Sequence, residues 1–303
     1  LSSNIVQHLQ IDPQQNLWIS TNGGGINKLR LSSFQHHTIN EGNTANIVKS
    51  ITKGTKDDLW LATYGGGFIH ITDDEYHAYI AGKDKFNGME VLLSNAIDQQ
   101  GNSWFGSLND GVFYFDGNTV KNFTTTHGLL NNTIRALHVD QKGNVWLGTY
   151  GGLSRFDGQE FTHFTTASGL PSNQINAITE DQRGDLWLGT AAGLVKFDGN
   201  TFTIFSRKEG LASNAVTSVA IDMEQRVWLG MKDAGAAVMD DAGITSFTKE
   251  QGLLSDQVRS LIIDQKEGVW LGTNKGLNYI QSIEQGNEQH YKLFAFDKDN
   301  GLK

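Results

Sequence analysis

The side chains that could bind a ligand stand at two fixed distances from seven regularly spaced tryptophans. One column lies eleven residues before each tryptophan, and the other lies four to six residues after it. Residue types in both columns vary from copy to copy, so these positions are either specialised for a ligand or simply unconstrained. The candidate ligand-binding residues are Asn22, Lys49, Tyr64, Asn109, Asp110, Arg135, Tyr150, Asn176, Lys232, Asp233, Arg259, Asn274 and Lys275.

The chemistry of these candidates suits a polar or anionic small molecule. Tyr64 and Tyr150 offer flat faces for stacking on sugar rings and hydroxyls that can orient them. Arg135 and Arg259 can clamp a carboxylate or a sulfate through two parallel hydrogen bonds. We expect binding by these groups with no catalytic residue, no metal ligand and no cofactor.

The tryptophans define an internal repeat, and its period is that of a four-stranded propeller blade. Other columns appear when the copies are aligned on tryptophan: Asn or an acid fourteen residues before it, usually Asp six before it, and usually Gly two after it. The tryptophans are Trp18, Trp60, Trp104, Trp146, Trp187, Trp228 and Trp270.

Each copy reads as four short strands. In the fourth copy we expect them at residues 134–139, 144–149, 153–156 and 161–165. The D-x-x-G-N turn and the F-D-G hairpin signal separate strands, because Asp bonds its own backbone and Gly accepts positive φ. Helical periodicity is absent.

These features predict an all-β chain, a single seven-bladed β-propeller with four antiparallel strands per blade over residues 1–303. A blade cannot bury both its faces alone, whereas seven blades closed in a ring can. The tryptophans should then pack between blades, where truncation to Ala would cost about 3–5 kcal/mol. The expected blades are residues 1–42, 43–87, 88–129, 130–170, 171–211, 212–253 and 254–303.

The two variable columns should meet at the mouth of the central channel, a common ligand position in closed β architectures. The alternative is that these side chains line a wet channel and pair with Asp233 or Glu90. Within the repeat, Lys53 and Gly54 replace the usual apolar–Asp pair, Asn95 occupies an apolar column, and the seventh copy carries a longer excursion at residues 281–290 before its outer strand.

The consensus N-x-I-x-x-I-x-x-D-x-x-G-x-L-W-I-G-T-x-x-G-L-x-x-F-D-G resembles the two-component regulator propeller repeat, and it is almost unbroken in residues 132–158 and 173–199. The resemblance implies an extracytoplasmic sensor of a membrane-bound histidine kinase, on the periplasmic or extracellular side. It also implies tandem propellers, an immunoglobulin-like domain and a transmembrane helix elsewhere in the protein, with oligosaccharide as a common ligand.

The two ends of the chain stand at the same phase of the repeat. Residues 1–4 match residues 211–214, and Gly301-Leu302 matches the Gly-Leu that opens other copies. We therefore expect a ring cut from a longer sensor, with flanking sensor domains as partners. We also expect blades one and seven to close without exchanging a strand.

Two other function classes compete with a sensor. A propeller-type polysaccharide or lactone lyase would need a base beside a charge-neutralising group, and Tyr64, Tyr150, Arg135 and Arg259 could be recruited to that task. No histidine falls in either variable column, and His8 and His138 lie within first strands, which favours binding. An interaction scaffold would need a contiguous exposed apolar patch.

Composition excludes several other classes. The formal charge of −9 argues against a nucleic-acid surface, and the absence of cysteine excludes a disulfide scaffold and a thiolate metal site. The Gly-Gly-Gly segments lack the Lys-Ser/Thr of a phosphate loop. The recurring Asp lacks the spacing of a calcium loop, so turn capping explains it better. No apolar run is long enough for direct membrane insertion.

Overall fold

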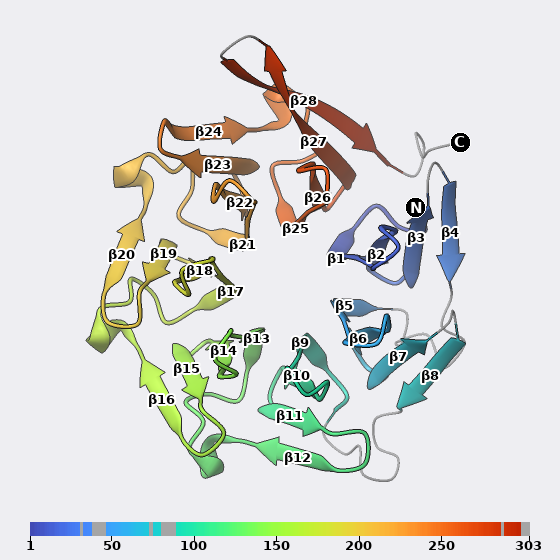
Figure 1. Cartoon of the computed structure of the whole chain (residues 1–303), viewed down its shortest axis with the longest axis vertical. Helices are drawn as coiled ribbons and strands as arrows, with labels where there is room; N and C mark the ends of the chain where they lie inside the picture. The colour runs from blue at the N-terminus through green and yellow to red at the C-terminus, as the bar shows by residue number, and fades with distance from the viewer. Residues whose placement is uncertain (31–32, 38–46, 73–74, 80–88, 286–287, 298–303) are drawn as a thin grey trace.

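Seven four-stranded antiparallel sheets surround one axis, each built from four consecutive strands (Figure 1). The computed structural model describes residues 1–303 apart from 31–32, 38–46, 73–74, 80–88, 286–287 and 298–303. The first strand of each sheet lies innermost and the fourth lies outermost. The prediction of a seven-bladed propeller is confirmed. We number the sheets as blades 1 to 7 in chain order.

Blades 1 to 4 hold the first sixteen strands. In blades 1 and 2 these are β1 (Val6–Ile11), β2 (Leu17–Thr21), β3 (Ile26–Arg30), β4 (Ser33–His37), β5 (Val48–Lys53), β6 (Leu59–Thr63), β7 (Phe68–Thr72) and β8 (Glu75–Tyr79). In blades 3 and 4 they are β9 (Leu92–Ile97), β10 (Ser103–Ser107), β11 (Val112–Phe115), β12 (Val120–Phe123), β13 (Ile134–Val139), β14 (Val145–Thr149), β15 (Leu153–Phe156) and β16 (Phe161–Phe164).

Blades 5 to 7 complete the ring, and four short 3₁₀ turns follow outer strands. The strands are β17 (Ile175–Glu180), β18 (Leu186–Thr190), β19 (Gly193–Phe197), β20 (Phe202–Phe205), β21 (Val216–Ile221), β22 (Val227–Met231), β23 (Ala236–Asp240), β24 (Gly243–Phe247), β25 (Val258–Ile263), β26 (Val269–Thr273), β27 (Gly276–Gln285) and β28 (Glu288–Phe296). The turns are η1 (Thr125–His127), η2 (Thr166–Ser168), η3 (Arg207–Glu209) and η4 (Lys249–Gln251). None of the helices in the described ranges has the length and apolar character needed to cross a bilayer.

The Asn column fourteen residues before tryptophan has a local cause. The side-chain oxygen of Asn132 accepts the backbone N–H of Thr125 at 2.9 Å, and Asn173 and Asn214 do the same for the next two 3₁₀ turns. Each bond satisfies a donor at the start of a turn that has no partner within the turn. The column therefore fixes the path from one outer strand to the next inner strand.

The tryptophans pack between blades, as predicted. Trp18 is 2% exposed and contacts the core of blade 2, including Val48 and Leu61. Trp146 packs in the same way against the core of blade 5, and Trp270 against that of blade 1. Burial of each indole ties one blade to its neighbour all the way round the ring.

Glycine two residues after tryptophan lets neighbouring blades approach closely. A Cβ at Gly148 would lie 2.9 Å from Cγ2 of Ile175, which belongs to the inner strand of the next blade. At the closing interface a Cβ at Gly272 would lie 2.5 Å from Cγ1 of Val6. The first and last blades thus meet through the same contact as the four other blade pairs that carry glycine at this position.

Ring closure involves no strand exchange in the described residues. β1 pairs with β2 of its own blade, and β25 to β28 form a complete sheet of their own. This confirms the prediction made from the phase of the two chain ends.

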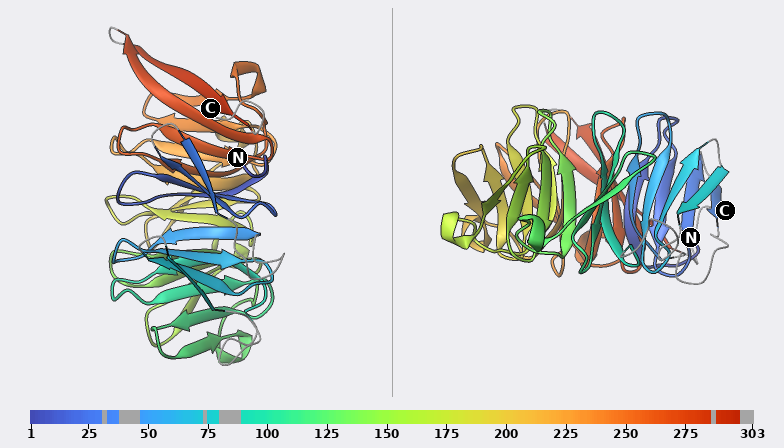
Figure 2. Two further views of the ribbon diagram at one scale, coloured as in Figure 1. Left: turned by 90° about the vertical axis from the view of Figure 1, so that its right-hand side faces the viewer. Right: turned by 90° about the horizontal axis from the view of Figure 1, so that it is seen from below.

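The last blade differs from the others in its outer hairpin. β27 and β28 are ten and nine residues long, and they project beyond the rim of the ring (Figure 2). The expectation of an excursion at residues 281–290 before the outer strand is wrong. Paired backbone continues from Gln281–Lys292 to Gln285–Glu288, so the extra residues lengthen the hairpin.

Candidate functional site

A β-bulge in every inner strand places the first variable column in the channel. Pairing of β13 with β14 skips from Ile134 to Ala136, so Arg135 stands in the bulge. The same shift occurs at the equivalent position of the other six blades. Bulges redirect a side chain out of the regular alternation of a strand. The column eleven residues before tryptophan is therefore aimed at the ring axis.

All seven bulge residues line a central cavity of about 1040 Å³. The second variable column lies at the same end, because the backbone N–H four residues after tryptophan donates to the residue just before the inner strand. Tyr64 donates to Ile47 and Lys232 to Ala215, each at 2.9 Å. The structure thus brings the two columns together at one mouth. The bulge residues are Gln7, Lys49, Leu93, Arg135, Asn176, Thr217 and Arg259.

The predicted candidates divide into two groups by position. Lys49, Arg135, Tyr150, Asn176, Lys232 and Arg259 line the cavity. The remaining candidates lie outside its lining: Asn22, Tyr64, Asn109, Asp110, Asp233, Asn274 and Lys275.

The cavity has one sign of charge. Its lining contains Lys49, Arg135, Lys232 and Arg259, and within the described part of the chain it contains no Asp or Glu. No ion pair between described residues joins these cations to Asp233 or Glu90. Burial lowers the pKa of Lys49, and the positive charges of Arg259 and Arg135 lower it further. The cavity lining is therefore positive although the whole chain is negative.

Two cations are held by tyrosine rings in the same blade. The guanidinium of Arg135 lies 5.4 Å from the ring centroid of Tyr150 and donates to its hydroxyl at 3.0 Å. The ammonium of Lys49 lies 5.6 Å from the ring of Tyr64 and 3.5 Å from Oε1 of Gln7. Tyr150 is 46% exposed, so much of its surface stays open to a ligand.

Polar side chains also tie the inner strands together. The amide of Asn176 donates to the carbonyl of Val216 at 2.9 Å, and the hydroxyl of Thr217 donates to the carbonyl of Val258 at 2.7 Å. Each bond joins one blade to the next. These two positions of the ring thus have a structural partner, whereas Arg259 has no hydrogen bond or ion pair to any described residue.

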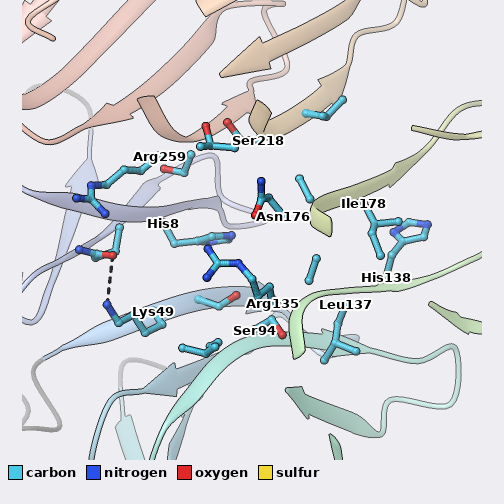
Figure 3. A pocket seen from close by; sticks show the side chains of 18 of the residues that line it. His8, Lys49, Ser94, Arg135, Leu137, His138, Asn176, Ile178, Ser218 and Arg259 are labelled. Atoms are coloured by element: carbon cyan, nitrogen blue, oxygen red, sulfur yellow. Dashed lines mark hydrogen bonds between the residues drawn. The ribbon is translucent and has the colours of Figure 1, made fainter. Parts of the chain in front are cut away.

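His8 lies in the channel near the cations, and sequence reasoning did not place it there (Figure 3). Its Nδ1 accepts the backbone N–H of Ile51 at 3.2 Å, and burial lowers its pKa to about 4. The ring is therefore neutral near pH 7, and its proton must sit on Nε2. The only available signal was its position ten residues before tryptophan, next to the bulge.

His138 lines a different part of the same cavity. Its Nε2 lies 3.4 Å from Oε2 of Glu180, which also accepts the backbone N–H of Gln141 at 3.0 Å. Burial lowers the pKa of His138, while the bond to Glu180 opposes that shift. The pair joins blades 4 and 5.

Among the described residues, the acidic groups close enough to share a cation lie outside the cavity, at Asp222, Glu224 and Glu267. Arg226 forms ion pairs with Asp222 at 2.5 Å and with Glu224 at 2.6 Å. A protein cation thus already compensates this cluster.

The sequence repeat has counterparts in known proteins. The two component regulator propeller model matches residues 1–23, 128–151 and 169–192. These three segments are similar to the two component regulator propeller repeat. No curated protein matches the sequence significantly.

Extracellular domains of putative hybrid two component systems occur among the similar solved structures. The extracellular domain of the putative hybrid two component system BT3049 from B. thetaiotaomicron is 23% identical, with a TM-score of 0.81, over 98% of this chain and 44% of its own. That of BT4673 from the same organism is 20% identical, with a TM-score of 0.77, over 93% of this chain and 39% of its own. The chain thus spans less than half the length of either structure.

A second group of similar structures contains enzymes. Virginiamycin B lyase from Staphylococcus aureus is 11% identical, with a TM-score of 0.75, over 90% of this chain and 93% of its own. At these identities the likeness concerns the fold alone.

Proposed function

We propose that this regulator propeller is the extracytoplasmic ligand-sensing domain of a two-component system. It binds a small polar ligand, such as an oligosaccharide, at the channel mouth. Binding is passed to a histidine kinase through flanking domains of a longer protein. The domain itself is not catalytic, and it lies on the periplasmic or extracellular side of a bacterial membrane.

One observation carries the binding proposal. Seven bulges direct seven side chains of six different types into one cavity, while the residues around them repeat. A wide cavity with convergent polar groups is the usual form of a small-molecule site. The regulator propeller repeats, together with similarity to two extracellular domains of hybrid two component systems, support the sensor role.

The histidines favour binding over lyase chemistry. A general base works best with a pKa near the operating pH, whereas the pKa of His8 is lowered to about 4 and its Nδ1 is occupied by Ile51. His138 is engaged with Glu180. A lyase would nevertheless be revealed by growing ultraviolet absorbance of an unsaturated product when the domain is mixed with uronic-acid polymers.

The scaffold alternative has less support. The exposed large hydrophobic side chains among the described residues are spread over four blades, whereas a docking face would gather them. They are Tyr64, Tyr76, Tyr150, Ile204 and Met223.

Calorimetry and thermal-shift measurements with acidic and neutral oligosaccharides test the sensor proposal. We expect at least one oligosaccharide to stabilise the domain, because a ligand that binds only the folded state raises its stability. Tyr150→Ala should weaken that binding. Tyr76→Ala is the matched control, because Tyr76 is 39% exposed on the outer strand of blade 2. Equal loss in both variants would place the site elsewhere.

A further inference from the structure

We propose that the ligand is an anionic saccharide. Its carboxylate or sulfate is received by Lys49, Arg135 and Arg259, and a sugar ring stacks on Tyr150. This inference rests on the proposed binding function and adds the chemical class of the ligand.

The first support is the local reversal of charge. The chain carries a formal charge of −9, yet the cavity lining holds four cations and, among the described residues, no carboxylate. A cleft lined by one sign of charge focuses its field and concentrates counter-ions of the opposite sign. A neutral ligand would gain nothing from this arrangement, whereas an anion would.

The second support is the proximity of the cations to each other. Lys49, Arg135 and Arg259 come from blades 2, 4 and 7 and line the same cavity. Burial lowers the pKa of Lys49, and the positive charges of Arg259 and Arg135 lower it further. Like charges that face one another across a cavity repel. An anion between them would replace that repulsion with attraction, so its binding is favoured by groups already in place.

The third support is the unused hydrogen-bonding capacity. Arg259 has no hydrogen bond or ion pair to a described residue, and Arg135 donates from one terminal nitrogen to Tyr150. In Figure 3 the side chain of Arg135 reaches toward the middle of the cavity beside His8. Guanidinium donors match the paired oxygens of a carboxylate or a sulfate. Nε2–H of His8 adds a neutral donor at the same depth.

Size and the remaining side chains point to a saccharide carrying the acid group. A cavity of about 1040 Å³ is at the upper end of small-molecule sites. The amides of Gln7, Gln174, Asn176 and Gln257 also line it, and the donors and acceptors that their bonds to protein groups leave over can bond to hydroxyls. The exposed ring of Tyr150, with Arg135 beside it, offers a flat surface for a sugar.

Isothermal titration calorimetry on the 303-residue chain with three matched probes tests the inference. The probes are a galacturonic-acid trisaccharide, a sulfated disaccharide and a neutral galactose trisaccharide. We expect one acidic probe to bind at least about tenfold more tightly than the neutral one, a difference typical of a charge-assisted contact. Comparison of the two acidic probes shows whether carboxylate or sulfate is preferred. Added salt should weaken the binding of the acidic probe, because it screens charges.

Variants locate the anion within the cavity. Arg135→Ala and Arg259→Ala should each weaken the acidic probe about tenfold or more, and Arg259→Glu should abolish its binding. Lys275→Ala is the control. It removes a cation of the second variable column, four to six residues after a tryptophan, and this cation lies outside the cavity lining. Thermal unfolding of each variant shows whether the ring is intact, and it should be, because Arg135 and Arg259 are exposed.

The outcomes separate this inference from the proposed function. If the neutral probe binds as tightly as the acidic ones, with no effect of salt or of the arginine variants, the inference is overturned and the sensor proposal stands. If Lys275→Ala weakens the acidic probe as much as Arg259→Ala does, the anion does not lie in the cavity. If no probe of either class binds, the inference fails and the proposed function loses support with it.

Discussion

The indole N–H of Trp60 donates to Asp58, only two residues earlier, at 3.0 Å. The other six tryptophans donate to an aspartate six residues earlier, as Trp18 does to Asp12 at 2.8 Å. Blade 2 has Gly54 at that earlier position, and a Cβ there would lie 2.0 Å from Oδ1 of Asp58. The carboxylate has moved within the loop while its bond to the tryptophan has been kept.

Replacing Gly54 and Asp58 of blade 2 with the residues found at the equivalent positions of blade 4 should restore the arrangement of the other blades. Blade 4 carries Asp140 and Asn144 at the equivalent positions, and both Asn144 and Trp146 donate to Asp140. We expect Asp58→Asn alone to cost about 1.5–3 kcal/mol, since it removes a buried charged acceptor. Gly54→Asp alone should also destabilise, because of the clash with Asp58.

The double variant Gly54→Asp, Asp58→Asn should recover most of the stability lost by the single changes. Urea unfolding gives the free energies, and their non-additivity measures the coupling. A double variant as unstable as the sum of the two singles would show that the position of the carboxylate is not interchangeable.

Truncation of an interface tryptophan should be among the most damaging single changes. Trp228 is 1% exposed and packs against the core of blade 7, so Trp228→Ala should cost about 3–5 kcal/mol. Trp228→Phe keeps a ring and loses the bond to Asp222, so a smaller loss of about 1–2 kcal/mol is expected. Denaturant midpoints of the two variants measure this, and equal losses would mean that the hydrogen bond, rather than packing, dominates.

The glycine column should be intolerant of large side chains. Gly272→Leu places atoms where Cγ1 of Val6 lies, so we expect a loss of about 1–3 kcal/mol from overpacking. Val6→Ala in the same chain should recover part of that loss, because it removes one of the two atoms that lie 2.5 Å from the added Cβ, the other being Oγ of Ser260. Calorimetric melting of the single and double variants tests this, and no recovery would show that the conflict with Val6 does not dominate the loss.

Acid should destabilise the ring through His8. An unfolded histidine titrates near pH 6.5, whereas burial lowers the pKa of His8 to about 4. Between these pH values the unfolded chain binds a proton at His8 and the folded chain does not. The contribution of neutral His8 to the free energy of unfolding is therefore fully present above about pH 6.5 and declines as the pH falls toward 4.

His8→Gln should therefore reduce the slope of unfolding free energy against pH between 7 and 4. Some slope should remain, because burial also lowers the pKa of His138. Urea unfolding at several pH values provides the data. An unchanged slope in the variant would show that His8 is not buried as a neutral ring.

The fold could be predicted in full outline because its determinants are local and repeated. Trp, Asp, Gly and Asn recur at fixed spacing, and each makes an equivalent contact in most copies, such as that of Asn132 with its 3₁₀ turn. The long hairpin of blade 7 could not be foreseen, because residues 281–290 match no other copy and there is nothing to align them with. A paired extension and a loop look alike in such a segment.

The site was predictable only in part, for a geometric reason. The variable columns indicated the mouth of the channel. The bulge in the inner strand decides which side chains face the axis, and no residue type in the sequence marks that bulge. Arg135 and Arg259 lie in bulges and line the cavity, whereas Tyr64 contacts Lys49 from outside its lining. His8 follows the bulge residue and was overlooked because strand alternation alone does not assign it to the channel.

The contact between Gly272 and Val6 means that the interface between the first and last blades is not of a special kind. The interface that closes it is built like those within the chain, with β1 seated against β25 and β26. The ring can therefore form whichever blade the polypeptide begins with. A circular permutant that joins the present ends by a short linker and opens before another blade should fold to the same ring, with the same cations facing the same mouth.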